Sequence, residues 1–275
     1  TAKPLLRLTK GIHIVTPRAT EQAHVLFAKR DGRLFFVVPW LDSTIVGTTD
    51  TDYDGDPAVA SATEDDVRYL QDEAHRAFPN APFNEIYFTW AGVRALVREE
   101  GVSEGQVSRK HALFDHERRD GIAGVLSVVG GKITAYRAIA EEVTDVASRK
   151  LGAAGAAIRN SSTASTPLPG ADGSRARAVA GLAAGDASLA APLCPHHKGV
   201  AAEIVHAVRS EWARSIGDAL LRRTALGLAP CQGLDCVDVV AQLMARLLGW
   251  DAERTKSEVA AYSREIEPMR RFSLA

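Results

Sequence analysis

The sequence has no long apolar run, few cysteines and almost no net charge, and each shortage argues against a class of protein. No segment approaches the roughly 18 to 20 apolar residues that a membrane-spanning helix needs, and the opening TAKPLLRLTKG lacks the apolar core of a signal peptide. The 33 basic and 34 acidic residues leave a formal charge of −1, which argues against broad binding of nucleic acid or of an anionic membrane. Three cysteines do not make the disulfide framework of a secreted protein, so a cytoplasmic location is expected.

The chain is long and apolar enough to bury a substantial core, since 46% of its 275 residues are hydrophobic. No internal repeat is evident, and the chain begins at Thr1 rather than at Met, as expected of a fragment or a processed product. Composition predicts three parts: a first domain at 1–151, a linker at 152–190 that is rich in Ala, Gly and Ser, and a second domain at 191–275.

Short β-rich runs alternate with turn-forming residues in the first domain. Because Asp31-Gly32 is a hairpin signal, the first four runs predict an antiparallel meander. The acidic stretch Thr63–Asp66 resembles a capping box and predicts a helix that ends before Pro79. A second helix is expected from near Thr134 to Gly152. The predicted strands are 12–15, 24–28, 33–38, 44–49, 86–97, 106–114 and 124–129.

The second domain carries helical periodicity. Apolar residues recur at fourfold spacing from Ile204 through Val208, Trp212 and Ile216 to Leu220, and Val239, Leu243 and Leu247 with Trp250 predict a further helix. Residues 253–266 predict a third. The expected fold class is therefore α+β, with an antiparallel or mixed sheet followed by a small all-helical C-terminal domain.

Five motifs, in order, resemble the second half of the FAD-dependent glycerol-3-phosphate dehydrogenases. They are KGIHIVTPR (10–18), RLFFVVPW followed by TIVGTTDTDYDGDP (33–57), TWAGVRALV (89–97), VSRKH (107–111) and LSVVGGKITAYR (126–137). Residues 203–224 and 240–251 resemble the helical C-terminal domain of the same family. The resemblance implies the substrate-binding portion of a flavin oxidoreductase with its C-terminal domain.

The phosphate-binding turn with which that family opens is absent. No Gly-x-Gly-x-x-Gly occurs in the 275 residues, and this turn is what cradles the FAD pyrophosphate. The chain is therefore expected to be an incomplete part of a longer enzyme. Alone, it should bind FAD poorly and be inactive.

The resemblance implies oxidation of sn-glycerol 3-phosphate to dihydroxyacetone phosphate, with hydride transfer to the flavin. Loss of hydride is easier as the alcohol loses its proton, so a base is required. His13 is the candidate, because imidazole titrates near the operating pH of most enzymes and the resemblance places its motif beside the flavin. The alternative is a strand histidine satisfied by backbone groups.

Two arginines are the candidate substrate ligands. Arg94 follows Gly92 in a strand and would stabilise the developing alkoxide, and the guanidinium fork of Arg109 matches two phosphate oxygens. The alternative for Arg109 is a solvated charge on a strand.

A glycine loop is the candidate cofactor contact. Gly130, Gly131, Lys132, Ile133 and Thr134 follow a strand and open a helix, whose N–H groups and positive dipole suit the flavin N1 and C2 carbonyl edge. Thr48, Thr49, Asp50 and Asp52, by contrast, are assigned to turn capping.

The cysteines leave three alternatives open. The spacing of Cys194, His196, Cys231 and Cys236 resembles the [2Fe-2S] domain of some anaerobic-type members, with His196 where that pattern has its second cysteine. The same four residues could ligate zinc. The favoured interpretation is that no metal is bound and that these are reduced thiols in a helical core.

Other functions stay open as alternatives: a related flavin-dependent amino-acid oxidase or dehydrogenase, or a non-catalytic electron-transfer or assembly module that uses the cysteine-containing domain. The family further implies a quinone or other redox acceptor and peripheral contact with the inner face of the cell membrane. A homo-oligomer is compatible with this interpretation, and no nucleic acid is expected.

Overall fold

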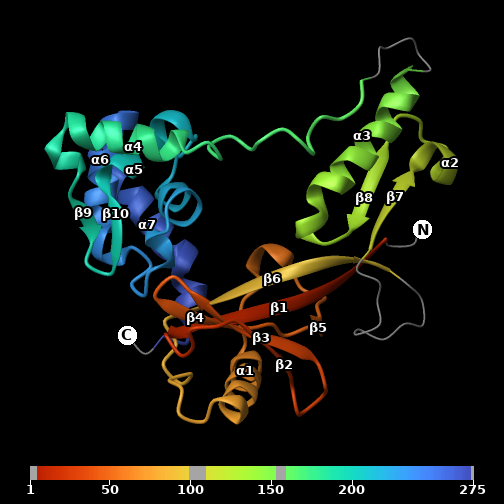
Figure 1. The fold of residues 1–275 in the computed structure, drawn as a ribbon, viewed down its shortest axis with the longest axis horizontal. Coiled ribbons are helices and arrows are strands. Elements are labelled where there is room, and N and C mark those ends of the chain that lie inside the picture. Colours follow the sequence, from red (N-terminus) through yellow and green to blue (C-terminus); the bar gives the residue numbers. More distant parts are fainter. Residues whose placement is uncertain (1–4, 99–109, 153–158, 274–275) are drawn as a thin grey trace. The chain divides into compact units, whose positions relative to one another are not determined.

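The computed structural model describes residues 5–98, 110–152 and 159–273. The chain forms two compact units (Figure 1). The first comprises Thr1–Asn84 and Trp90–Pro167, and the second comprises Glu85–Thr89 and Leu168–Ala275. The α+β class with a helical C-terminal unit, as expected from the sequence, is confirmed.

A six-stranded sheet is the centre of the first unit. Its order is β2-β3-β4-β1-β5, and β6 also pairs with β1. The predicted meander holds for β2, β3 and β4, but β1 pairs with β4 and not with β2. The strands are β1 (Leu6–Pro17), β2 (His24–Phe27), β3 (Leu34–Trp40), β4 (Ser43–Gly47), β5 (Thr51–Asp52) and β6 (Phe88–Val97).

Helix α1 (Glu64–Ala77) covers one face of this sheet. A buried ion pair joins the two elements, with Lys10 Nζ 2.7 Å from Asp66 Oδ2. Ile12 and Ile14 are fully buried on the same side of β1 as Lys10, because alternate residues of a strand point to the same face. The residues of β1 that alternate with Lys10, Ile12 and Ile14, including His13, therefore point to the opposite face of the sheet. The predicted capping box of α1 is present between Thr63 and Asp66.

A hairpin and a long helix complete the first unit. Strands β7 (His111–Asp115) and β8 (Leu126–Gly130) pair antiparallel, with the short α2 (His116–Asp120) between them. A 3₁₀ turn, η3 (Ile133–Ala135), then leads into α3 (Tyr136–Gly152), as the sequence predicted.

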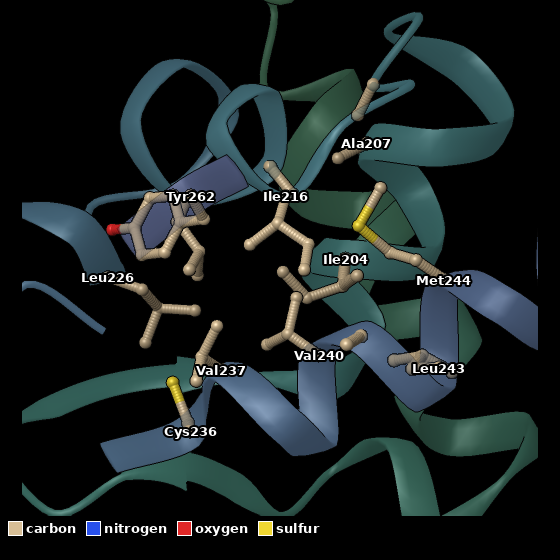
Figure 2. Packing of buried hydrophobic residues seen from close by; sticks show 14 of the residues in the cluster. Ile204, Ala207, Ile216, Leu226, Cys236, Val237, Val240, Leu243, Met244 and Tyr262 are labelled. Carbon is tan, nitrogen blue, oxygen red and sulfur yellow. The ribbon is translucent and has the colours of Figure 1, made fainter. Parts of the chain in front are cut away.

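The second unit is built around one hydrophobic core (Figure 2). Ile204, Ile216, Val240, Met244 and Tyr262 are at most 1% exposed there. Its elements are α4 (Ser174–Gly185), β9 (Pro192–Cys194), β10 (His197–Val200), α5 (Ala201–Ser210), the π-helical η5 (Asp218–Arg223), α6 (Val237–Leu248) and α7 (Ala252–Arg270), with 3₁₀ turns η4 (Ala187–Leu189), η6 (Leu226–Leu228) and η7 (Leu234–Cys236).

The single helix predicted from Ile204 to Leu220 is wrong. Helix α5 ends at Ser210, and Trp212 has a φ of 60° and is 75% exposed. Ile216 and Leu220 are buried as the periodicity required, but they lie beyond this break. A left-handed residue ends an α-helix whatever the apolar spacing beyond it.

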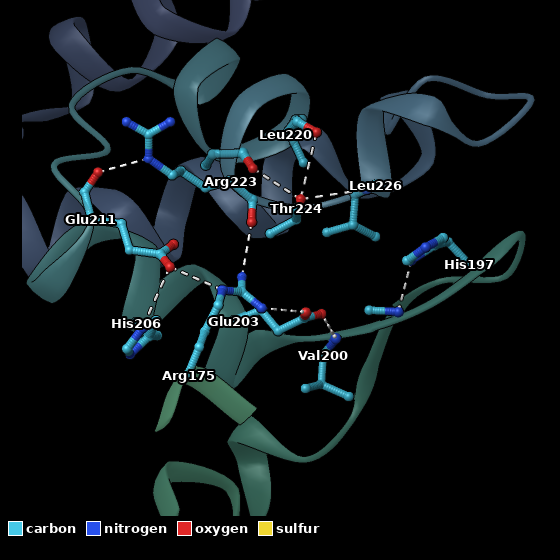
Figure 3. Close-up of polar contacts among 12 residues, drawn as sticks. Arg175, His197, Val200, Glu203, His206, Glu211, Leu220, Arg223, Thr224 and Leu226 are labelled. Carbon is cyan, nitrogen blue, oxygen red and sulfur yellow. Dashed lines mark hydrogen bonds and ion pairs between the residues drawn. The ribbon is translucent and has the colours of Figure 1, made fainter. Parts of the chain in front are cut away.

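Part of the segment 152–190, predicted to be a linker, is helical, because α4 lies within it. Polar contacts from Arg175 join α4 to its unit (Figure 3). Its Nε donates to Glu211 Oε1 at 2.9 Å, and its Nη2 donates to the carbonyl oxygen of Arg223 at 2.8 Å. The main segment of the second compact unit accordingly begins at Leu168.

Within the described residues, no helix combines the length and the apolar character that crossing a bilayer requires.

Candidate functional site

His13 lies on the sheet face opposite α1, directly over a glycine. The register pairs His13 with Gly47 across β1 and β4, and a Cβ added to Gly47 would come within 2.1 Å of His13 Cδ2. Real Cβ contacts are not this short, so only glycine leaves room for the imidazole here. Phe36 pairs with Gly47 on its other side and is 40% exposed on this face.

Arg94 from β6 is held over a second glycine in the same way. A Cβ at Gly11, two residues before His13 on the same face of β1, would be 2.2 Å from Arg94 Nη2. The guanidinium donates from Nη1 to Asp50 Oδ1 at 3.0 Å and from Nη2 to Thr48 Oγ1 at 2.9 Å. It also donates from Nη2 to the carbonyl oxygen of Thr49 at 3.2 Å. The two glycines thus place an imidazole and a guanidinium on one face of the sheet.

Thr48 and Asp50 have a role that the sequence assignment missed. Assigned there to turn capping, they bond the Arg94 side chain and set its position. The other two residues also make contacts with distant residues in place of turn caps, since Thr49 Oγ1 accepts from the amide of Ile12 at 3.0 Å and Asp52 binds Arg7. The signal in the sequence is the hydroxyl of Thr48 and the carboxylate of Asp50, which follow directly after a strand that ends in Gly47 and could have indicated partners for an arginine.

The electrostatics of the site keep His13 neutral. Burial lowers the pKa of His13, and the positive charge of Arg94 lowers the same pKa further. Both effects disfavour the imidazolium, so the imidazole is unprotonated at neutral pH. A neutral imidazole next to a fixed positive charge can accept a proton from a bound alcohol while the guanidinium stabilises the oxygen.

A cavity of about 1610 Å³ adjoins this face and brings Arg94 together with the predicted cofactor loop. Phe36 and Leu96 also line it. The lining loop residues are Gly130, Gly131, Lys132, Ile133 and Thr134.

The loop needs both of its glycines. Gly130 has a φ of 74° and Gly131 a φ of 89°, values that side chains other than glycine rarely adopt. A Cβ on Gly130 would lie 2.9 Å from the carbonyl oxygen of Lys110, and one on Gly131 would lie 2.8 Å from Ile139 Cδ1. The chain therefore turns tightly at the end of β8, and Ile133, 85% exposed, lies against the cavity.

Arg109, the predicted phosphate ligand, lies outside the described residues, so its role stays a prediction. The nearby His111 is described, and its Nε2 is 2.8 Å from Glu142 Oε2.

The cysteine set differs from the one predicted. Cys194 Sγ and Cys231 Sγ are 3.4 Å apart, and a carboxylate oxygen of Asp235 joins them so that all three atoms lie within 4.8 Å of one another. His196 Nε2 instead lies 3.3 Å from Asp235 Oδ2, and the Cys236 thiol donates to the carbonyl oxygen of Gly233. Sequence reasoning missed Asp235.

Two family models match the chain. The one described as FAD dependent oxidoreductase matches residues 1–145, and the one described as the C-terminal domain of alpha-glycerophosphate oxidase matches residues 168–255.

Similar curated proteins include a glycerol-3-phosphate dehydrogenase of Synechocystis, 30% identical over 94% of this chain and 52% of the relative. Glycerol-3-phosphate dehydrogenase 2 of Mycobacterium tuberculosis is 30% identical over 95% of this chain and 49% of the relative. The chain thus spans about half the length of these two curated relatives. The X-ray structure of the Bacillus halodurans glycerol-3-phosphate dehydrogenase complexed with FAD superposes with a TM-score of 0.78 at 24% identity, over 96% of this chain and 57% of that one, which shows a shared fold.

Proposed function

The chain belongs to the FAD-dependent oxidoreductase family, and on that premise we propose that it is part of an enzyme that oxidises sn-glycerol 3-phosphate to dihydroxyacetone phosphate. The names of the relatives support this substrate, and so does the match of the second unit to a C-terminal domain of alpha-glycerophosphate oxidase.

The observation that carries the proposal is the pairing of His13 with Arg94 on the open face of the sheet. A secondary alcohol gives up hydride more readily as its O–H is deprotonated, and burial beside Arg94 keeps His13 in the neutral form that accepts this proton. The guanidinium, already bonded to Asp50 and Thr48, needs little reorientation to stabilise negative charge on the substrate oxygen. His13 is thus the proposed base, and Arg94 the ligand of the reacting oxygen.

The loop at 130–134 fits the ring end of a flavin. Its glycines open a turn whose residues, Lys132 among them, line a cavity larger than the roughly 300 to 1,000 Å³ of common ligand pockets. Bound FAD would supply the acceptor for the hydride. The pyrophosphate and adenosine would be held by residues other than a Gly-x-Gly-x-x-Gly turn of this chain, since none is present in its sequence.

Four further elements of the proposal rest on the sequence alone, the cytoplasmic location on its cysteine content and the others on the motif resemblance. Arg109 binds the substrate phosphate through its guanidinium fork. A quinone or another redox acceptor takes the electrons from the flavin. The enzyme is cytoplasmic, with peripheral contact at the inner face of the cell membrane, and it acts as a homo-oligomer.

The decisive experiment replaces His13 by Asn in the complete enzyme. Rapid-mixing measurement with glycerol 3-phosphate should show flavin reduction slowed by about 100 to 10,000-fold, because the proton acceptor is gone while the side-chain shape is nearly kept. The FAD content should be unchanged. Wild-type reduction rates would remove His13 from the chemistry, and reduction by an amino acid but not by glycerol 3-phosphate would contradict the proposed substrate.

A further inference from the structure

Three donor atoms converge in the second unit, away from the proposed site. They belong to Cys194 at the end of β9, to Cys231 between η6 and η7, and to Asp235 within η7. Cys194 is buried, Cys231 is half-buried and Asp235 is exposed, so the group reaches from the core to the surface. We propose that Cys194, Cys231 and Asp235 bind one divalent cation of the zinc class.

The spacing of the sulfurs suits a shared metal ion. With zinc–sulfur bonds of about 2.3 Å and a tetrahedral angle, two thiolates on one Zn²⁺ lie about 3.8 Å apart. Cys194 Sγ and Cys231 Sγ are 3.4 Å apart, so a shift of a few tenths of an ångström accommodates the ion. Two sulfurs and a carboxylate oxygen are all accepted zinc ligands, whereas iron–sulfur clusters are held by thiolate and imidazole.

Backbone amides face both sulfurs. The amide of His196 donates to Cys194 Sγ at 3.4 Å, and the amides of Gly233 and Asp235 hydrogen-bond to the Cys231 sulfur. Burial and the hydrogen bond with Cys194 raise the pKa of the Cys231 thiol to about 11, so the metal ion has to displace its proton on binding. The amide donors would then orient the metal-bound sulfurs.

A constrained turn brings Asp235 back to Cys231. Gln232 and Gly233 have successive positive φ values of 49° and 72°, the first of which is unusual for a residue with a side chain. Gln232 is fully buried, and Tyr262 donates to its carbonyl oxygen at 2.5 Å. The fold therefore holds this turn in place from the core of the unit.

His196 and Cys236 have different parts in the proposal. His196 Nε2, 3.3 Å from Asp235 Oδ2, orients the carboxylate and is a positioning residue. The Cys236 thiol donates to the carbonyl oxygen of Gly233 at 3.4 Å, so it keeps its proton and is not a ligand. A cavity of about 500 Å³ lined by Cys231, Asp235 and His196 gives the ion a path from solvent. Because three protein ligands fill three positions of a tetrahedral ion, the fourth position would face this cavity.

The test uses the full chain, reduced and stripped with a chelator, and titrates it with Zn²⁺ or Co²⁺. Metal analysis should find one Zn²⁺ per chain, and Co²⁺ should give thiolate-to-cobalt charge-transfer bands. Cys194→Ser and Cys231→Ser should abolish these bands, and Asp235→Asn should weaken binding by at least about tenfold. Cys236→Ser is the matched control and should bind metal like the wild type, because a hydroxyl can donate to the same carbonyl.

Three outcomes would overturn the proposal. The first is a wild-type chain that binds Co²⁺ without charge-transfer bands. The second is a Cys194–Cys231 disulfide that resists the reductant, so that neither sulfur is available to the metal. The third is iron with acid-labile sulfide that Cys236→Ser also removes, because that result identifies a two-iron cluster. The wild-type titration decides the matter even if a variant fails to fold.

Discussion

Gly11→Ala should displace the Arg94 guanidinium while leaving the fold intact. The new Cβ would come within 2.2 Å of Nη2, 2.5 Å of Nη1 and 2.6 Å of Cζ, whereas ordinary contacts are 3.4 Å or more. The guanidinium must therefore move by roughly 1 Å, and it is the far end of a flexible side chain, so the strand itself need not shift. The movement breaks or stretches its bonds to Asp50, Thr48 and Thr49.

The expected magnitude follows from the charged contact. A hydrogen bond between ionised partners contributes about 1.5 to 3 kcal/mol, and a misplacement of about 1 Å in a catalytic group can cost about 100-fold in rate. We therefore expect flavin reduction by glycerol 3-phosphate in the complete enzyme to fall by about 100-fold. In the chain itself, the pKa of His13 should rise, because one of the two causes that lower it is moved away.

Gly92→Ala is the matched control on β6, since a Cβ there meets nothing within 4 Å. It should leave the reduction rate and the His13 pKa unchanged. Rapid mixing measures the first quantity, and an NMR titration of the histidine ring protons measures the second. A Gly11→Ala enzyme with wild-type rate and an unmoved His13 pKa would refute the view that close approach over Gly11 positions Arg94.

Four more expectations can be measured directly. Arg94→Met should raise the pKa of His13 toward the ordinary 6.5 and shift the acid limb of flavin reduction to higher pH, because neutral His13 is the active form; an NMR titration that finds no rise would contradict the assigned cause. Arg175→Met should lower the free energy of unfolding of the second unit by about 1 to 3 kcal/mol, as seen in denaturant titrations, and a change near zero would show that its bonds to Glu211 and Arg223 are not stabilising. Arg109→Ala in the complete enzyme should raise KM for glycerol 3-phosphate roughly tenfold or more, and an unchanged KM would remove Arg109 from the site. The 275-residue chain alone should carry well under one FAD, measured by fluorescence after acid release, whereas a stoichiometric amount would mean that it holds the pyrophosphate by another route.

Local chemistry made much of the fold predictable from the sequence. The capping box at Thr63 and the glycine turn at 130–131 each act over a few residues, and both are present in the structure. His13 and Arg94 were singled out by motif, and their placement over Gly47 and Gly11 accounts for these two glycines.

The missed features depend on contacts between distant residues. Asp50 meets Arg94 across 44 positions of sequence, so no local pattern marks it as a partner. Asp235 reaches the sulfurs through a turn in which Gln232 has a left-handed backbone, and a glutamine in a sequence does not predict that conformation. Helix α4 lacks a strong apolar stripe, and its polar contacts from Arg175 to Glu211 and Arg223 cannot be seen in its own sequence.

The division of the chain into units limits where recombination can exchange one unit for another. Residues 85–89 belong to the second unit, although the chain on both sides of them belongs to the first. Thr89 Oγ1 donates to the carbonyl oxygen of Met269 at 3.2 Å, so this short segment is bonded to the last helix of its unit. A cut between Pro167 and Leu168 would leave it in the wrong piece. The helical unit is therefore not a detachable module, and recombination that exchanged it at this point would also have to preserve a five-residue insertion encoded far upstream.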